Sequence, residues 1–101
     1  MKILRDELKV YKDKNILITG GASFIGSHLT ELMLDSGANI TVIDDLSSGK
    51  EEHINDIKND VNFIKGDVRN PDLLSTQMKN IEIVFNLAAM HGGRGYIETH
   101  P

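Results

Sequence analysis

The chain has 101 residues and a formal net charge of −4; 40% of its residues are hydrophobic and 26% are charged. This length suits one small globular domain and leaves no room for two. The acidic balance, without any cluster of Lys and Arg, argues against nucleic-acid binding. No apolar run approaches the roughly 18 residues of a membrane span, so we expect no membrane contact. The sequence holds no cysteine, which excludes disulfides and agrees with a cytoplasmic location.

Residues 1–14 form a charged leader that lacks the apolar core of a secretory signal. Its apolar residues are spaced to make one face of a short helix, and a mobile leader is the open alternative. We expect the folded domain to occupy residues 15–101.

Four short segments rich in β-branched or aromatic residues are expected to form strands, at 16–18, 40–43, 61–64 and 81–85. Apolar residues stand at adjacent positions in most of them, which indicates burial on both faces. Such burial is typical of a parallel sheet covered by helices.

Helical patterns fill the intervals between these strands. The helix after the first strand is expected to bury the apolar face Ile25, Leu29, Leu32 and Met33. A short helix is expected at 50–58, and Asn70-Pro71-Asp72 begin another with an N-cap, a first-turn proline and a first-turn acid. The alternation β-α-β-α-β-α-β predicts an α/β fold with right-handed crossovers.

The segment 19–26, TGGASFIG, lies between the first strand and the first long helix. Glycines there allow a sharp turn, a close approach of backbone to a pyrophosphate and tight packing of helix on strand. The helix N-terminus offers free N–H groups and a positive dipole end to phosphates. The segment therefore predicts a nucleotide cofactor.

Asp44 ends the expected second strand. A carboxylate at this place can accept hydrogen bonds from the hydroxyls of an adenosine ribose. It would also repel a 2′-phosphate, which favours NAD over NADP. The alternative is that Asp44 and Asp45 only cap the strand and start a turn.

The run 16–29, ILITGGASFIGSHL, resembles the opening of the extended short-chain dehydrogenases, in particular the NAD-dependent nucleotide-sugar epimerases and dehydratases. Three further segments agree with that family in order and spacing: VIDDLSSG at 42–49, GDVR at 66–69 and NLAA at 86–89. The resemblance covers roughly residues 15–101. It implies the N-terminal half of a Rossmann fold, a parallel sheet with strand order 3-2-1-4 and flanking helices.

The resemblance also implies NAD as cofactor and a role for each matching position. The implied pyrophosphate contacts are Gly20, Phe24, Ile25 and Gly26. The implied ribose contacts are Asp44, Asp45, Leu46, Ser47, Ser48 and Gly49. Asp67 and Val68 would hold the adenine, and Leu87, Ala88 and Ala89 would line the path toward the nicotinamide. The family usually has glycine where this chain has Ser23, whose hydroxyl is expected either to bond the pyrophosphate or to cap the helix.

The segment 90–96, MHGGRGY, follows the fourth strand and is similar to a loop near the sugar in the GDP-mannose 3,5-epimerase branch of the family. Ligands of open parallel sheets bind beyond the carboxyl ends of the strands. We therefore expect Gly92, Gly93 and Arg94 to contact substrate, with a flexible surface loop as the alternative.

The family's catalytic Tyr-x-x-x-Lys pair is missing from these residues. The residue four positions after Tyr11 is Asn15, and the residue four positions after Tyr96 is His100, so neither tyrosine has the lysine. We therefore assign no catalytic residue and no metal ligand, and expect this chain to be a truncated, inactive, NAD-binding portion of an epimerase or dehydratase. The parent would act on a nucleotide sugar by transient oxidation and hydride return. A non-catalytic NAD-binding module and a fragment of an NADP-dependent reductase are the alternatives. An incompletely covered fourth strand makes a homo-oligomer the expected state.

Overall fold

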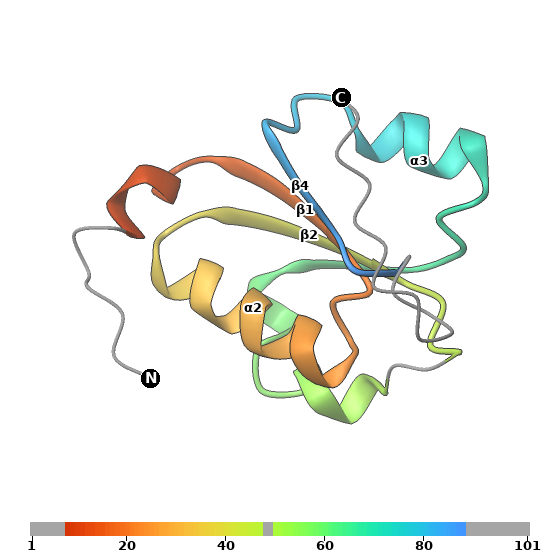
Figure 1. Cartoon of the computed structure of the whole chain (residues 1–101), viewed down its shortest axis with the longest axis horizontal. Coiled ribbons are helices and arrows are strands. Elements are labelled where there is room, and N and C mark those ends of the chain that lie inside the picture. The colour runs from red at the N-terminus through yellow and green to blue at the C-terminus, as the bar shows by residue number, and fades with distance from the viewer. Residues whose placement is uncertain (1–7, 48–49, 89–101) are drawn as a thin grey trace.

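The computed structural model describes residues 8–47 and 50–88. In these segments four strands form one parallel sheet in the order β3-β2-β1-β4, as predicted. The strands are β1 (Asn15–Thr19), β2 (Asn39–Asp44), β3 (Asn62–Lys65) and β4 (Ile83–Asn86). Helices α2 (Phe24–Asp35) and α3 (Pro71–Gln77) connect them and lie on opposite sides of the sheet (Figure 1). The predicted α/β architecture is therefore confirmed.

The connection from β2 to β3 differs from the single short helix that the sequence predicts at 50–58. It contains two 3₁₀ helices, η2 (Glu51–Ile54) and η3 (Lys58–Asp60). Asn55 and Asp56 stand between them, and such side chains compete with the helical backbone for hydrogen bonds.

A further 3₁₀ helix, η1 (Lys9–Tyr11), precedes the sheet in the part of the leader that the structure describes. Residues 1–7 of the predicted leader lie outside the described residues. No helix within 8–47 and 50–88 has both the length and the apolar character needed to cross a bilayer.

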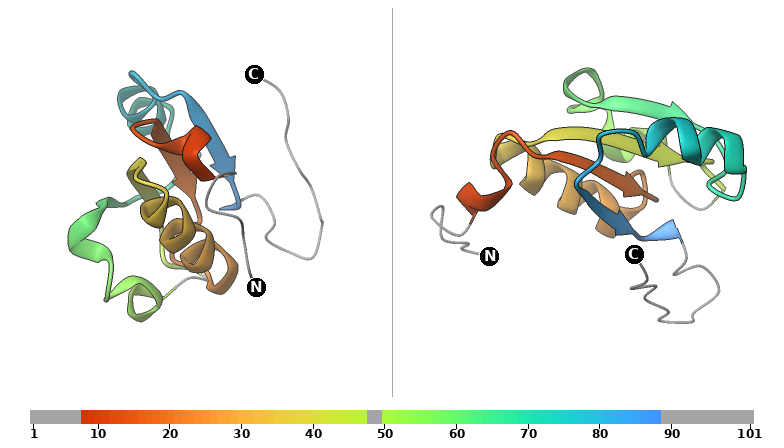
Figure 2. Two further views of the ribbon diagram at one scale, coloured as in Figure 1. Left: turned by 90° about the vertical axis from the view of Figure 1, so that its left-hand side faces the viewer. Right: turned by 90° about the horizontal axis from the view of Figure 1, so that it is seen from above.

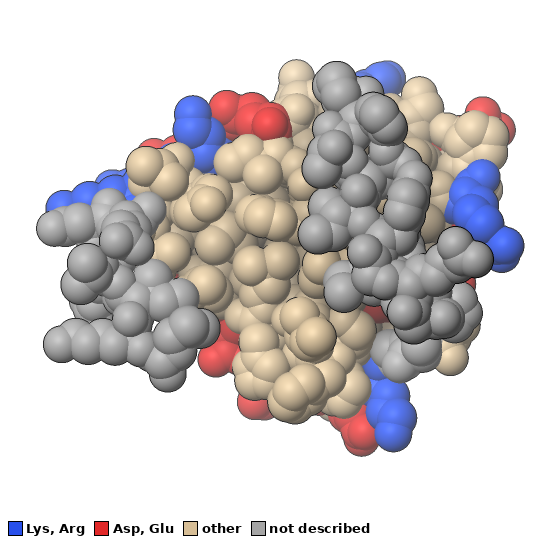
Figure 3. Space-filling view, in the orientation of Figure 1, with Lys and Arg blue, Asp and Glu red and all other residues tan. Residues whose placement is uncertain are grey.

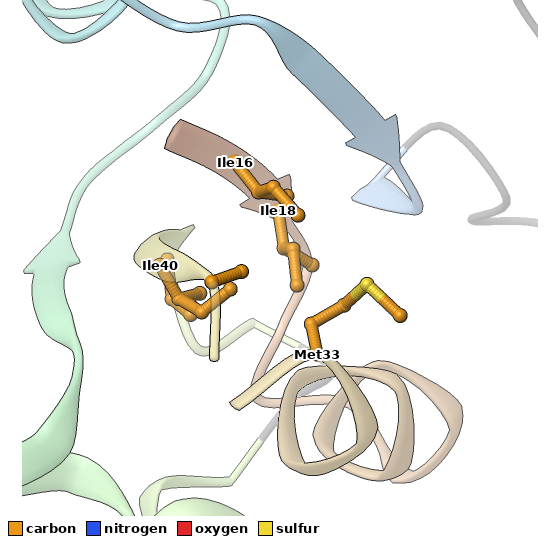
Figure 4. Close-up of a cluster of buried hydrophobic side chains, with 6 residues drawn as sticks. Ile16, Ile18, Met33 and Ile40 are labelled. Atoms are coloured by element: carbon orange, nitrogen blue, oxygen red, sulfur yellow. The ribbon is translucent and has the colours of Figure 1, made fainter. Parts of the chain in front are cut away.

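The main core lies between α2 and one face of the sheet. Ile16 and Ile18 of β1 and Ile40 of β2 are almost fully buried there, and Met33 of α2 points toward them (Figure 4). Burying a side chain of this size is worth about 1.5–3 kcal/mol. The strand segments that carry the site are therefore held firmly from one side.

The buried face of α2 differs in one respect from the predicted one. Ile25 is 64% exposed, and the residues of α2 that are buried are Gly26, Ser27, Thr30 and Met33. Small residues at the first two turns let the helix approach the sheet closely, and this rotates Ile25 outward. The apolar pattern predicted the later turns of the helix correctly and its first turn wrongly.

Strand β4 pairs only with β1 in the part of the chain that the structure describes. It lies along one edge of the sheet (Figure 2), and Val84 at its centre is 42% exposed. Figure 3, in the orientation of Figure 1, shows charged side chains mostly around the periphery of the face that it draws, and uncharged surface nearer the middle where no grey atoms cover it. Such an edge suits pairing with another strand, but self-association stays a prediction.

Side-chain caps begin both α-helices. Ser23 is the N-cap of α2: its hydroxyl accepts the Gly26 N–H at 2.9 Å and donates to the Gly20 carbonyl at 2.8 Å. Asn70 caps α3 by accepting the N–H groups of Asp72 and Leu73, as predicted. Of the two roles predicted for Ser23, the structure contains the capping role.

Replacing Ser23 by alanine should lower the free energy of unfolding by about 1 kcal/mol, because the Gly26 N–H loses its acceptor. Ser23→Gly is the matched control and should cost only about a few tenths of a kcal/mol, since glycine tolerates the N-cap position. Urea denaturation followed by circular dichroism measures both. Equal stability of Ser23→Ala and the unaltered chain would show that the cap contributes nothing.

Candidate functional site

A cleft of about 840 Å³ opens at the carboxyl ends of the strands. The parallel register brings these ends together, because Thr19 of β1 pairs with Ile43 of β2 and with Asn86 of β4. The predicted site residues that line the cleft are Gly20, Ser23, Phe24, Ile25, Asp44, Asp45, Ser47, Asp67, Val68, Leu87 and Ala88. Segments distant in the sequence thus meet in one cavity.

Two predicted contacts are not among the residues that line the cleft. Gly26 is buried under the glycine turn, and the Leu46 N–H donates to the Asp44 Oδ1 atom at 2.7 Å. Gly26 therefore packs against the lining residue Gly20, and Leu46 contacts the lining residue Asp44 through its backbone. The predicted positions outside the described residues are Ser48, Gly49, Ala89, Gly92, Gly93 and Arg94.

The glycine turn requires glycine at two positions. Gly20 has a φ of 77°, and a Cβ atom there would lie 2.9 Å from the Ala88 backbone nitrogen. A Cβ atom on Gly26 would lie 2.1 Å from the Gly20 carbonyl oxygen. The turn therefore packs directly against the end of β4 and against the first turn of α2.

The turn leaves two backbone donors at the start of α2. The Gly26 N–H is taken by the Ser23 hydroxyl and the Ser27 N–H by the Ser23 carbonyl. The N–H groups of Phe24 and Ile25 have no acceptor within the helix because they belong to its first turn. Both residues line the cleft and are about two-thirds exposed. This end of α2 can therefore bind an anion.

Asp44 is 6% exposed and holds the turn from the side of β2. Its Oδ2 atom accepts the Ala22 N–H at 2.9 Å, and its Oδ1 atom accepts the Leu46 N–H at 2.7 Å. The turn-starting role that the sequence left as an alternative is therefore present. A carboxylate has about four acceptor positions, so Asp44 can also accept hydrogen bonds from a ligand in the cleft.

An ion pair marks the far end of the cleft, after β3. The single Arg69 Nε–H is shared between the two carboxylate oxygens of Asp67, each 3.1 Å from Nε. Arg69 Nη2 donates to Asp67 Oδ2 at 2.8 Å, and the Arg69 backbone N–H donates to Asp67 Oδ1 at 2.8 Å. Hydrogen bonds from the Arg69 side chain and backbone lower the pKa of Asp67 to about 2. Hydrogen bonds from Ser47 lower the pKa of Asp45 nearby. The cleft therefore presents ionised carboxylates at this end.

Sequence reasoning missed several lining residues, among them Arg69 and Asn86. The Asp-x-Arg spacing in GDVR is a signal that could have identified Arg69, because a turn brings such residues together. Asn86 Oδ1 accepts the Thr19 hydroxyl at 2.6 Å, which joins the ends of β4 and β1. That contact depends on the strand register, which the amino-acid pattern does not reveal.

Replacing Arg69 by glutamine should raise the pKa of Asp67 from about 2 toward its ordinary value of 3.8. Because folding lowers this pKa, the ion pair stabilises the fold at pH values above about 4 and loses its effect as the pH falls toward 2. A ¹³C NMR titration of the Asp67 carboxyl carbon measures the pKa. Lys65→Gln, which removes a neighbouring cation, is the control and should leave it unchanged. An equal pKa in Arg69→Gln and the unaltered chain would contradict the role of Arg69.

The chain is similar in sequence and in structure to known epimerases and to a dehydratase. A UDP-glucose 4-epimerase of Mycolicibacterium smegmatis is 36% identical over 89 residues, which are 84% of this chain and 28% of that protein. The structure of an epimerase from Methanothermobacter thermautotrophicus is 38% identical, with a TM-score of 0.76. The match covers 82% of this chain and 25% of that one. The structure of dTDP-glucose 4,6-dehydratase from Bacillus anthracis in complex with NAD is 36% identical, with a TM-score of 0.69. The match covers 73% of this chain and 26% of that one.

The chain spans about a quarter of the length of the curated relatives that it matches. The model of the NAD dependent epimerase/dehydratase family matches residues 16–101, which include the glycine turn, strands β2, β3 and β4, and all of β1 except its first residue. By this match the chain belongs to the NAD dependent epimerase/dehydratase family.

Proposed function

We propose that this chain binds NAD in the cleft and is the NAD-binding portion of a nucleotide-sugar epimerase or dehydratase. The hydrogen bond from the Ala22 N–H to Asp44 carries this proposal. Through this bond, the free N–H groups at the start of α2 and the buried carboxylate at the end of β2 both face the same cleft. These groups suit a pyrophosphate and an adenosine ribose.

The residues present fit a dinucleotide. The cleft of about 840 Å³ is within the usual range of about 300–1,000 Å³ for ligand sites. Gly20 lines the cleft with bare backbone, and its close contact with the Ala88 backbone leaves no room for a side chain there. We assign the pyrophosphate to Gly20, Ser23, Phe24 and Ile25, with Gly26 beneath them. We assign the ribose to Asp44, Asp45, Leu46, Ser47, Ser48 and Gly49.

The remaining assignments follow the shape of the cleft. Asp67 and Val68 lie at its far end and suit the adenine, whose amino group can donate to a carboxylate. Leu87 and Ala88, with Ala89 beyond the described residues, would border the nicotinamide. The capping bonds of Ser23 leave the Phe24 and Ile25 N–H groups available to the pyrophosphate.

Charge favours NAD over NADP. Asp44 and Asp45 place negative charge where a 2′-phosphate would lie. An arginine near the ribose can accommodate that phosphate in NADP enzymes, but Arg69 already bonds both oxygens of Asp67. We infer that this arginine is committed to its ion pair and gives little help to a 2′-phosphate.

Bound NAD would supply the capacity to take up a hydride and to return it. The residues described above bind and orient the cofactor, and a longer parent protein would supply the acid–base groups. The names of the relatives support a nucleotide sugar as substrate of that parent, with Gly92, Gly93 and Arg94 as its contacts from this chain. Cytoplasmic location and a homo-oligomeric state stay predictions from the sequence.

Calorimetric titration of the chain with NAD and with NADP tests the proposal. We expect NAD to bind about tenfold more tightly or better, because the like charges of a 2′-phosphate and the carboxylate cost free energy. Tighter binding of NADP would contradict the role given to Asp44. Absence of binding by both dinucleotides would contradict the proposed function itself.

A further inference from the structure

The carbonyl oxygen of Ala22, in the middle of the glycine turn, has two donors from the segment after β2. It accepts the Lys50 N–H at 3.0 Å and lies 2.7 Å from the His53 Nδ1 atom. Ala22 is fully buried. Because a carbonyl oxygen can only accept, the Nδ1 atom of His53 must carry the proton in this contact.

The same alanine is also held through its nitrogen. The Ala22 N–H donates to Asp44, so both backbone polar groups of Ala22 are fixed by side chains from two separate segments. Ala22 immediately precedes Ser23, the N-cap of α2. The direction of the free N–H groups at the start of α2 therefore depends on how the backbone of Ala22 is held.

His53 also touches the rim of the cleft. The centroid of its ring lies 6.3 Å from that of the Phe24 ring in an edge-to-face arrangement. The ring of His28, in α2, makes the same kind of contact with Phe24 at 4.7 Å. Phe24 lines the cleft. The two histidines thus share a contact with Phe24, but the bond to the Ala22 carbonyl belongs to His53.

We propose that His53 is a positioning residue of the cofactor cleft, which holds the Ala22 carbonyl and so keeps the glycine turn in the shape that presents the N–H groups of Phe24 and Ile25. This role rests on the proposed function of the cleft. His53 donates to the turn from η2 and is not among the residues that line the cleft. The 3₁₀ helix η2, far from the turn in sequence, thereby becomes part of the site.

The position of the donor atom allows a sharp set of variants. His53→Ala removes the donor. His53→Asn places an amide nitrogen the same number of bonds from the backbone as Nδ1, whereas His53→Gln places it one bond further out. His28→Ala removes the other imidazole beside Phe24 and leaves the Ala22 carbonyl untouched, so it is the matched control.

Calorimetric titration with NAD gives the first measurement. We expect His53→Ala to weaken binding by about three- to tenfold, which corresponds to the loss of one hydrogen bond. His53→Asn should stay within about twofold of the unaltered chain, and His53→Gln should resemble His53→Ala. His28→Ala should bind normally. Unchanged binding by His53→Ala, failed rescue by His53→Asn, or an equal loss in His28→Ala would overturn the proposal.

A second measurement needs no ligand. Amide hydrogen exchange of the Ala22 N–H, followed by NMR in the free chain, should be faster in His53→Ala and normal in His53→Asn. Failure of the unaltered chain to bind NAD would contradict the proposed function, while this exchange experiment would still test His53. Unchanged exchange of the Ala22 amide in His53→Ala would remove the basis for a positioning role.

Discussion

The hydrogen bond between the Ala22 N–H and the Asp44 carboxylate is the contact on which the arrangement of the cleft depends. Asp44 is almost fully buried, and a buried charge is costly unless it is hydrogen-bonded. The turn satisfies the carboxylate with backbone N–H groups, and the carboxylate in return fixes the turn. The start of α2 and the end of β2 are therefore positioned relative to one another by this contact.

The position of β1 explains why these contacts converge at one place. Strands β2 and β3 lie on one side of β1 in the sheet, and β4 lies on the other side, so the strand order reverses at β1. Ligands of open parallel sheets bind at such a reversal. Here the Thr19 hydroxyl bonds Asn86 across the reversal, and Gly20 lies against Ala88. The position of the cleft is therefore a consequence of the sheet topology.

Sequence reasoning predicted the parts that depend on local pattern. Strand positions, the glycine turn, the Asn70 cap and the burial of Met33 follow from hydrophobic spacing and turn chemistry, and the resemblance to a known family supplied the strand order. Packing decided the rest. Ile25 turns outward because small residues bring α2 onto the sheet, and His53 meets Ala22 through a contact between residues 31 positions apart. No local pattern encodes a contact of that kind.

The side chain of Ser23 constrains the glycine turn. Its hydroxyl donates to Gly20 and accepts from Gly26, so both of its hydrogen-bonding functions are used within the turn. A glycine at this position would leave the Gly26 N–H without that acceptor, and the turn would be less constrained before a ligand arrives. With serine, the turn is already closed, and two N–H groups instead of three remain for an anion. A turn that is ordered in advance loses less conformational entropy when a ligand binds to it.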